Sequence, residues 1–233
     1  QSSVDIDTYG VFARRYSIPP PPNTAPSISL PGSALNYTEN DPATVIDTTA
    51  MASDPDSANF DGGTLTVDFT ANGTANDHLA IRDQGTGIGN IQVSGNNISY
   101  QPGGSSILIG TFTGGTDGST PLVINLNAGA DATAVQELMR NITYENVSDN
   151  PSTATRTVRF ELTDGDGGTS APVTKNINVG AVNDDPTNAG SLPSDLVFLQ
   201  DTQGKLDLSA IDLSDVDAGS GNLTLTITSD AGH

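Results

Sequence analysis

The sequence contains no cysteine and no tryptophan, and it has little positive charge. Without cysteine, no disulfide can stabilise the fold. Only eight Lys and Arg residues stand against 28 Asp and Glu residues, which gives a formal net charge of −20. We expect no nucleic-acid partner, because binding to phosphates requires clustered Lys and Arg. No apolar run reaches the roughly 18 residues of a membrane-spanning helix, so we expect no direct membrane insertion.

Apolar residues make up 34% of the chain and aromatic residues 5%, while 25 Gly and 14 Pro are present. This balance favours many short strands joined by turns. Residues 64–69, 91–93 and 155–162 alternate apolar and polar side chains, which predicts strands. Residues 131–140 instead have apolar side chains at helical spacing, with Asp131 and Thr133 as candidate caps. The pattern predicts an all-β, immunoglobulin-like β-sandwich with one short helix crossing between its sheets.

The linker Asn-Thr-Ala-Pro at 23–26 resembles Asn-Asp-Asp-Pro at 183–186, and the residues that follow each are also similar. Asp54 and Asp56 match Asp215 and Asp217, and each pair is followed by a Leu-Thr strand pattern. We therefore expect a complete module at 23–185 and the N-terminal part of a second, truncated module at 186–233. We expect residues 1–22 to form an extended segment with a Pro-rich linker, whose β-formers at 4–18 suit the last strand of a preceding module.

Three motifs resemble those of cadherin-like repeats: Ser-Asp-Pro-Asp at 53–56, the Gly- and Asp-rich loop at 163–168, and the linker at 181–186. The stretches 85–101, 109–115 and 140–168 look like modules repeated in giant bacterial surface and RTX-type adhesins. The resemblance implies immunoglobulin/cadherin-like sandwiches in tandem, in a secreted or cell-surface protein. It also implies calcium at the junctions between neighbouring repeats, which are then partners of one another.

The resemblance further implies which residues bind the metal. Calcium takes about six to eight oxygen ligands, which short Asp side chains in loops supply well. At the leading end of the complete module, facing Asn23, the implied ligands are Asp54, Asp56, Asp164 and Asp166. At its trailing end, facing the second module, they are Glu39, Asn183, Asp184, Asp185, Asp215 and Asp217.

The chain departs from the family pattern at three places. Gln200 stands where the first module has Glu39, and the upstream linker at Asn23 has no carboxylate of its own. The mid-module Asp-x-Glu pair of animal cadherins has no clear match, although Glu137 and Glu145 are candidates. An alternative reading of the acids, as the solvated surface of a secreted protein, requires no metal.

Other chemistry finds little support in the sequence. An EF-hand loop that begins with Asp needs Glu at its twelfth position. Loops beginning at Asp54 and Asp164 would have Leu65 and Lys175 at that position, so we expect no EF-hand. His78 is the one plausible base or zinc ligand, and we interpret it as a surface loop residue, because neither a nucleophile motif nor further zinc ligands accompany it. We expect no enzymatic activity.

The sequence thus predicts a calcium-binding structural repeat that stiffens a long adhesin. An alternative is a module that binds cell-surface glycans or copies of itself, with filaments formed by strand exchange. Glycan binding would need Tyr100, Tyr144 or Phe112 to line a groove.

Overall fold

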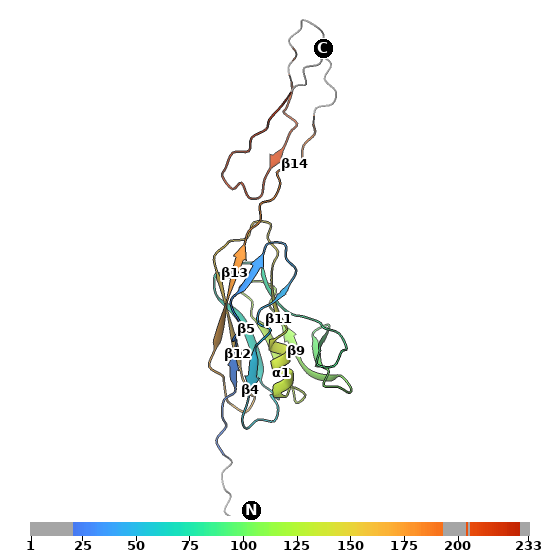
Figure 1. The fold of residues 1–233 in the computed structure, drawn as a ribbon, viewed down its shortest axis with the longest axis vertical. Helices are drawn as coiled ribbons and strands as arrows, with labels where there is room; N and C mark the ends of the chain where they lie inside the picture. Colours follow the sequence, from blue (N-terminus) through green and yellow to red (C-terminus); the bar gives the residue numbers. More distant parts are fainter. Residues whose placement is uncertain (1–20, 193–203, 205, 229–233) are drawn as a thin grey trace, which may run out of the picture.

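The computed structural model describes residues 21–192, 204 and 206–228. Its main body contains one large sheet, two smaller ones and a single helix (Figure 1). The large sheet consists, in spatial order, of β2 (Leu35–Thr38), β13 (Val173–Gly180), β12 (Arg156–Leu162), β5 (Thr64–Ala71), β10 (Leu122–Leu126), β9 (Ile107–Thr113), β8 (Asn97–Tyr100) and β7 (Ile91–Ser94). All neighbours in this sheet are antiparallel except β2 and β13, which run parallel.

The opposite side of the body is built from the short strands β3 (Thr44–Val45), β11 (Ile142–Asn146) and β6 (Asp77–Ile81), and from the pair β1 (Ser27–Ser29) and β4 (Met51–Ser53). Helix α1 (Ala132–Met139) links β10 of the large sheet to β11 of the three-stranded sheet. Oδ1 of Asp131 accepts a hydrogen bond from the N–H of Ala134 at 2.8 Å, which satisfies one free donor at the helix start. The predicted crossover helix is therefore confirmed, with Asp131 rather than Thr133 as its cap.

The core lies between the sheets and follows the period of two in the strands. In β12, four alternate side chains are buried, and the three between them are half-buried on the outer face. The rings of Tyr37 and Tyr144 meet edge to face at a centroid distance of 5.0 Å. The prediction of an all-β sandwich with one short helix is thereby confirmed. Among the described helical residues, none forms a helix long and apolar enough to cross a membrane.

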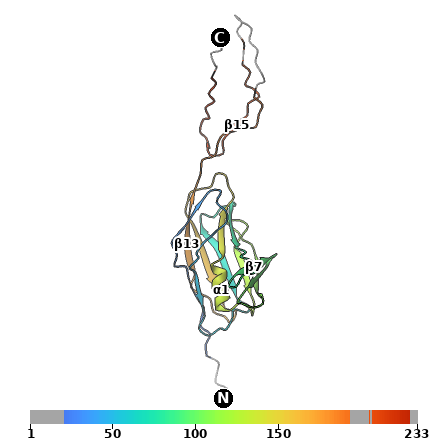
Figure 2. The same cartoon turned by 45° about the vertical axis from the view of Figure 1, so that its right-hand side comes forward.

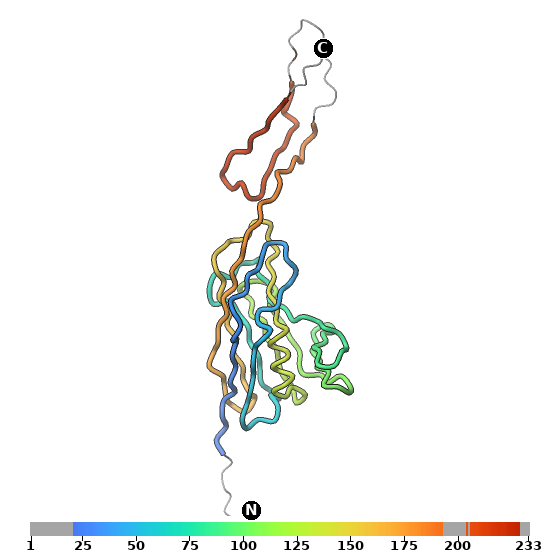
Figure 3. Tube along the Cα trace, viewed as in Figure 1, coloured from blue at the N-terminus to red at the C-terminus, as the bar shows by residue number. Residues whose placement is uncertain are grey.

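Beyond one end of the sandwich, residues 186–192 and 206–228 form a separate extended part of the chain (Figures 2 and 3). Its strands β14 (Thr187–Asn188) and β15 (Leu213–Ser214) are antiparallel, with Thr187 opposite Ser214. The sandwich begins in a similar way, with Ser27 of β1 opposite Ser53 of β4. Tandem repetition and the proposed domain boundaries stay predictions. The expected strand at 4–18 and the departure at Gln200 lie outside the described residues.

Candidate metal site

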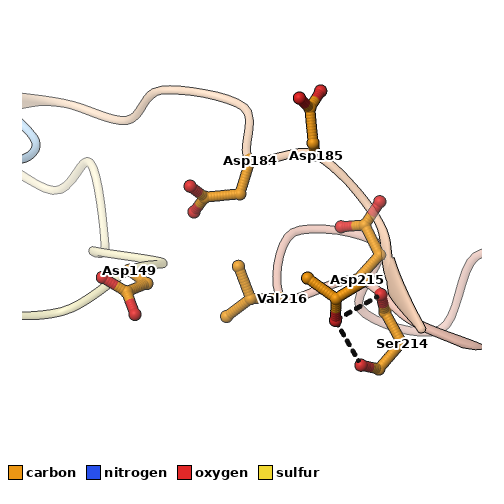
Figure 4. A pocket seen from close by; sticks show the side chains of 7 residues that line it. Asp149, Asp184, Asp185, Ser214, Asp215 and Val216 are labelled. Atoms are coloured by element: carbon orange, nitrogen blue, oxygen red, sulfur yellow. Dashed lines mark hydrogen bonds between the residues drawn. The ribbon is translucent and has the colours of Figure 1, made fainter. Parts of the chain in front are cut away.

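Three segments of the sandwich lie at the edge where it joins the second part of the chain. Strands β2 and β13 run parallel and end at this edge, and β12, antiparallel to β13, begins there. The edge therefore carries the turn after β2, the loop at 147–155 and the linker after β13. A pocket at the junction is lined by Asp149, Asp184, Asp185, Thr187, Ser214, Asp215 and Val216 (Figure 4).

Hydrogen bonds hold the linker against the second part of the chain. The N–H of Asp184 donates to Oδ2 of Asp217 at 2.5 Å. Oδ1 of Asp215 accepts from the N–H groups of Asp217 and Ala218 at 2.9 and 3.0 Å, which closes the loop into a turn. The side-chain amide of Asn150, in the loop after β11, donates to the carbonyl of Val216 at 2.7 Å. The acidic loop is thus fixed to the sandwich from two sides.

Glu39 lies in the turn after β2 and is only 4% exposed. Its N–H donates to the carbonyl of Gly180 at 2.9 Å, and its Oε2 accepts from the N–H of Val182 at 2.7 Å. These bonds tie the carboxylate to the start of the linker. Oε1 is buried and has no hydrogen-bond partner. A buried carboxylate oxygen without a donor or cation costs free energy, so this atom requires an explanation.

Asp184 shows the same feature, since its Oδ2 is buried without a partner. Burial raises the pKa of this carboxyl, and the negative charges of Asp217, Asp149, Asp215 and Asp185 raise it further. In Figure 4 its carboxylate projects into the pocket, whereas that of Asp185 points away.

Within the described residues, no ion pair offsets this charge. The four ion pairs that these residues form all lie elsewhere in the sandwich, at Glu137–Arg140, Asp77–Arg156, Asp68–Arg159 and Asp47–Lys175. The junction therefore concentrates carboxylates that form no ion pair with any described Lys or Arg.

Asp149 is a site residue that sequence reasoning missed. Its loop is held from inside the sandwich, because the guanidinium of Arg156 donates to the carbonyl oxygens of Ser152 and Ala154. Arg156 also pairs with Asp77 at 3.2 Å, and both side chains are completely buried. The only sequence signal was the turn composition Ser-Asp-Asn-Pro at 148–151, which indicates a loop but not where it lies.

The leading end of the sandwich brings together the other predicted ligands. Asn23 donates its side-chain amide to Oδ2 of Asp164 at 2.8 Å, and the N–H of Thr24 donates to Oδ2 of Asp56 at 2.9 Å. Burial raises the pKa of Asp164, but the bonds from Asn23 and from the backbone of the 165–168 loop outweigh it and lower the pKa.

The leading end is more nearly satisfied than the junction. Oδ1 of Asp54 accepts from the N–H groups of Asp56 and Ser57, and its Oδ2 is buried without a partner. The side chain of Asp166 is exposed. Thr24 corresponds to Asp184 at the junction, because the N–H of each residue donates to an Asp carboxylate. Thr24 differs in that its side chain adds no negative charge.

Within the part of the chain that the structure describes, no three His, Cys, Asp or Glu side chains converge into a ready-made metal site. Like charges repel one another when no cation lies between them, which favours separated carboxylates. The donor types fit calcium, since carboxylate oxygens of Asp149, Asp184 and Asp215 line the junction pocket, and Glu39 at the start of the linker has a buried oxygen without a partner.

Several other residues have different positions from those considered for them. Glu137 lies on α1 and pairs with Arg140 at 2.7 Å, Glu145 lies in β11, and neither is among the residues that line the junction pocket. His78 is half-buried within β6, and the prediction of a loop position is wrong, because residues 77–81 pair along β11. Tyr100 and Tyr144 are buried in the core and line no groove.

We compared the chain with models of known families, with curated proteins and with solved structures, and none of them matches it.

Proposed function

We propose that this chain is a calcium-binding structural repeat of an extracellular, cadherin-like adhesin, in which calcium stiffens the junction between successive sandwiches. The protein acts as a spacer and carries out no reaction. Its partners are the neighbouring repeats, and its place is the cell surface or the secreted medium.

One observation carries this proposal. Within the described residues, four buried side-chain atoms lack a hydrogen-bond partner, and three of them are carboxylate oxygens of Glu39, Asp54 and Asp184. All three residues are ligands implied by the family resemblance. Unpaired buried carboxylate oxygens are costly, and a cation bound beside Glu39 and Asp184 at the junction removes that cost there, as a second cation beside Asp54 does at the opposite, leading end. A merely solvated acidic surface does not account for oxygens that water does not reach.

The junction residues contribute to calcium binding in two ways. Glu39 and Asp184 supply the oxygens that have no other partner, while Asp149 and Asp215 supply further charge from the two sides of the junction. Calcium contributes positive charge, which neutralises the facing carboxylates and links the linker, the sandwich and the loop at 215–217. When calcium is absent, repulsion between these carboxylates favours bending at the linker.

X-ray scattering in calcium and in chelator tests the proposal on the full chain. The scattering profile of the calcium-loaded chain is expected to show a longer, stiffer particle than the chelated one. The Asp184→Asn, Asp215→Asn double variant should resemble the chelated chain under both conditions. A profile that does not respond to chelator contradicts the proposal.

A further inference from the structure

Strands β2 and β13 are the first and last strands of the large sheet in chain order, and they run parallel. Leu35 lies opposite Ile177, and Thr38 lies opposite Gly180. The described chain enters the sandwich at one end and leaves at the other (Figure 1). Tension along this axis pulls β2 by its N-terminal end and β13 by its C-terminal end. The two strands must then slide past each other, so that all hydrogen bonds between them are loaded together.

A buried side chain on β13 strengthens this connection. Lys175 is 4% exposed, and its Nζ donates to the carbonyl oxygen of Leu30 at 3.0 Å and to that of Gly32. It also pairs with Oδ2 of Asp47 at 2.6 Å. Residues 30–34 join β1 of the two-stranded sheet to β2 of the large sheet, and both acceptors lie in this connection. The last strand thus binds the entering segment directly.

Asp47 is itself firmly positioned. Its Oδ1 accepts from the N–H and hydroxyl of Thr49 at 2.8 and 2.6 Å, and its Oδ2 also accepts from the N–H of Gly32 at 3.0 Å. Both carboxylate oxygens and the ammonium group therefore have partners. Removal of one member of a buried pair leaves the other charge unpaired, which is far more disruptive than loss of a surface pair.

We propose that β2, β13 and the Lys175–Asp47 pair form a mechanical clamp that carries tension along the long axis of the sandwich. A pull on the segment before β1 is transmitted to the linker after β13 through β2, β13 and the Lys175–Asp47 pair. The central strands β5, β10 and β12 are outside this path. The clamp requires no calcium and is a property of the sandwich alone.

Single-molecule pulling of the full chain in chelator tests the clamp. With handles at the two chain ends, the sandwich should unfold at high force. A second chain carries handles on Ala43→Cys and Ala181→Cys, exposed positions just beyond the ends of β2 and β13. These thiols are unique because the chain has no cysteine. Pulling there peels β2 from β13 one bond at a time, and the unfolding force should be clearly lower.

Substitutions test the contribution of the lysine. Lys175→Met should raise the unfolding rate extrapolated to zero force by about 100-fold. Arg159→Met is the control for the loss of a partly exposed pair, because it removes a pair between β12 and β5 at 2.9 Å on the same sheet but outside the path. Equal forces in the two pulling directions, or equal effects of the two substitutions, would overturn the proposal. If Lys175→Met does not fold, the difference in unfolding force between the two pulling directions tests the proposal by itself.

Discussion

The N–H of Asp184 donates to Oδ2 of Asp217 at 2.5 Å, and this bond joins the linker to the acidic loop of the second part of the chain. The leading end contains the corresponding bond, from the N–H of Thr24 to Oδ2 of Asp56 at 2.9 Å. The two ends thus share this backbone hydrogen bond and differ in the side chain of the donor residue. Because Asp184 adds a carboxylate where Thr24 adds a hydroxyl, we expect calcium to bind more tightly at the junction than at the leading end.

Glu39→Gln tests the buried oxygen most selectively. The substitution keeps the size of the side chain and the acceptor for Val182, but it removes the charge. Calcium affinity at the junction should fall by about tenfold or more, which corresponds to roughly 1.4 kcal/mol. Calcium titration of the variant measures this loss. Glu161→Gln, on the outer face of β12, is the control and should bind as the unchanged chain does. Equal affinities in the two variants would show that Glu39 is not a ligand.

Asp149→Asn tests the residue that only the structure identifies. Asp149 lies at the pocket, and its negative charge contributes to the raised pKa of Asp184. The variant should bind calcium more weakly because less negative charge surrounds the ion. Its melting temperature in chelator should not fall, since removal of one of several facing charges relieves repulsion. An unchanged affinity together with a lower melting temperature would make Asp149 a structural residue only.

The buried pair of Asp77 and Arg156 should dominate the stability of the sandwich. Tyr144 and Asn146 donate to Oδ1 of Asp77 at 2.5 and 2.7 Å, so the carboxylate is surrounded by donors. Arg156→Met leaves the buried Asp77 carboxylate without its positively charged partner and should lower the free energy of unfolding by about 3–5 kcal/mol. Urea denaturation measures the change.

The control for that prediction is Arg159→Met. The Arg159 side chain is 40% exposed and pairs with Asp68 on the outer face. Its loss should cost about 1 kcal/mol or less. Similar losses in the two variants would contradict the role assigned to the buried pair.

Acid should destabilise the chelated sandwich. Burial raises the pKa values of Asp47 and Asp77, but hydrogen bonds to each carboxylate outweigh it, so both values are lowered. The donors are Lys175 and Thr49 for Asp47, and Tyr144 and Asn146 for Asp77. In Asp117, bonds from Ser119 lower the pKa to about 2. A lowered pKa in the folded state adds stability above the ordinary value of 3.8, and this stability is lost as pH falls further.

Thermal melting in chelator over a falling pH series measures this loss. The melting temperature should hold near neutral pH and fall steeply below about pH 4. A melting temperature that stays constant or rises there would mean that these carboxylates are not stabilised by their partners.

Local patterns account for much of the fold. The period of two in β12 and the cap at Asp131 are properties of neighbouring residues, so the sequence predicts them. The contact of Arg156 with Asp77 joins residues far apart in the chain, and no spacing rule indicates it. Asp149 went unnoticed for the same reason, because its place at the junction depends on which strands its loop connects. Similarly, the parallel pairing of β2 with β13 follows from topology rather than from composition.

Calorimetric titration of the decalcified full chain with calcium measures binding at the junction itself. We expect saturable binding and a melting temperature that rises with calcium, because a ligand bound only by the folded state stabilises it. Both effects should be lost in the Asp184→Asn, Asp215→Asn variant and kept in Glu161→Gln. A flat titration with an unchanged melting temperature would contradict the account and leave the acidic residues as a solvated surface.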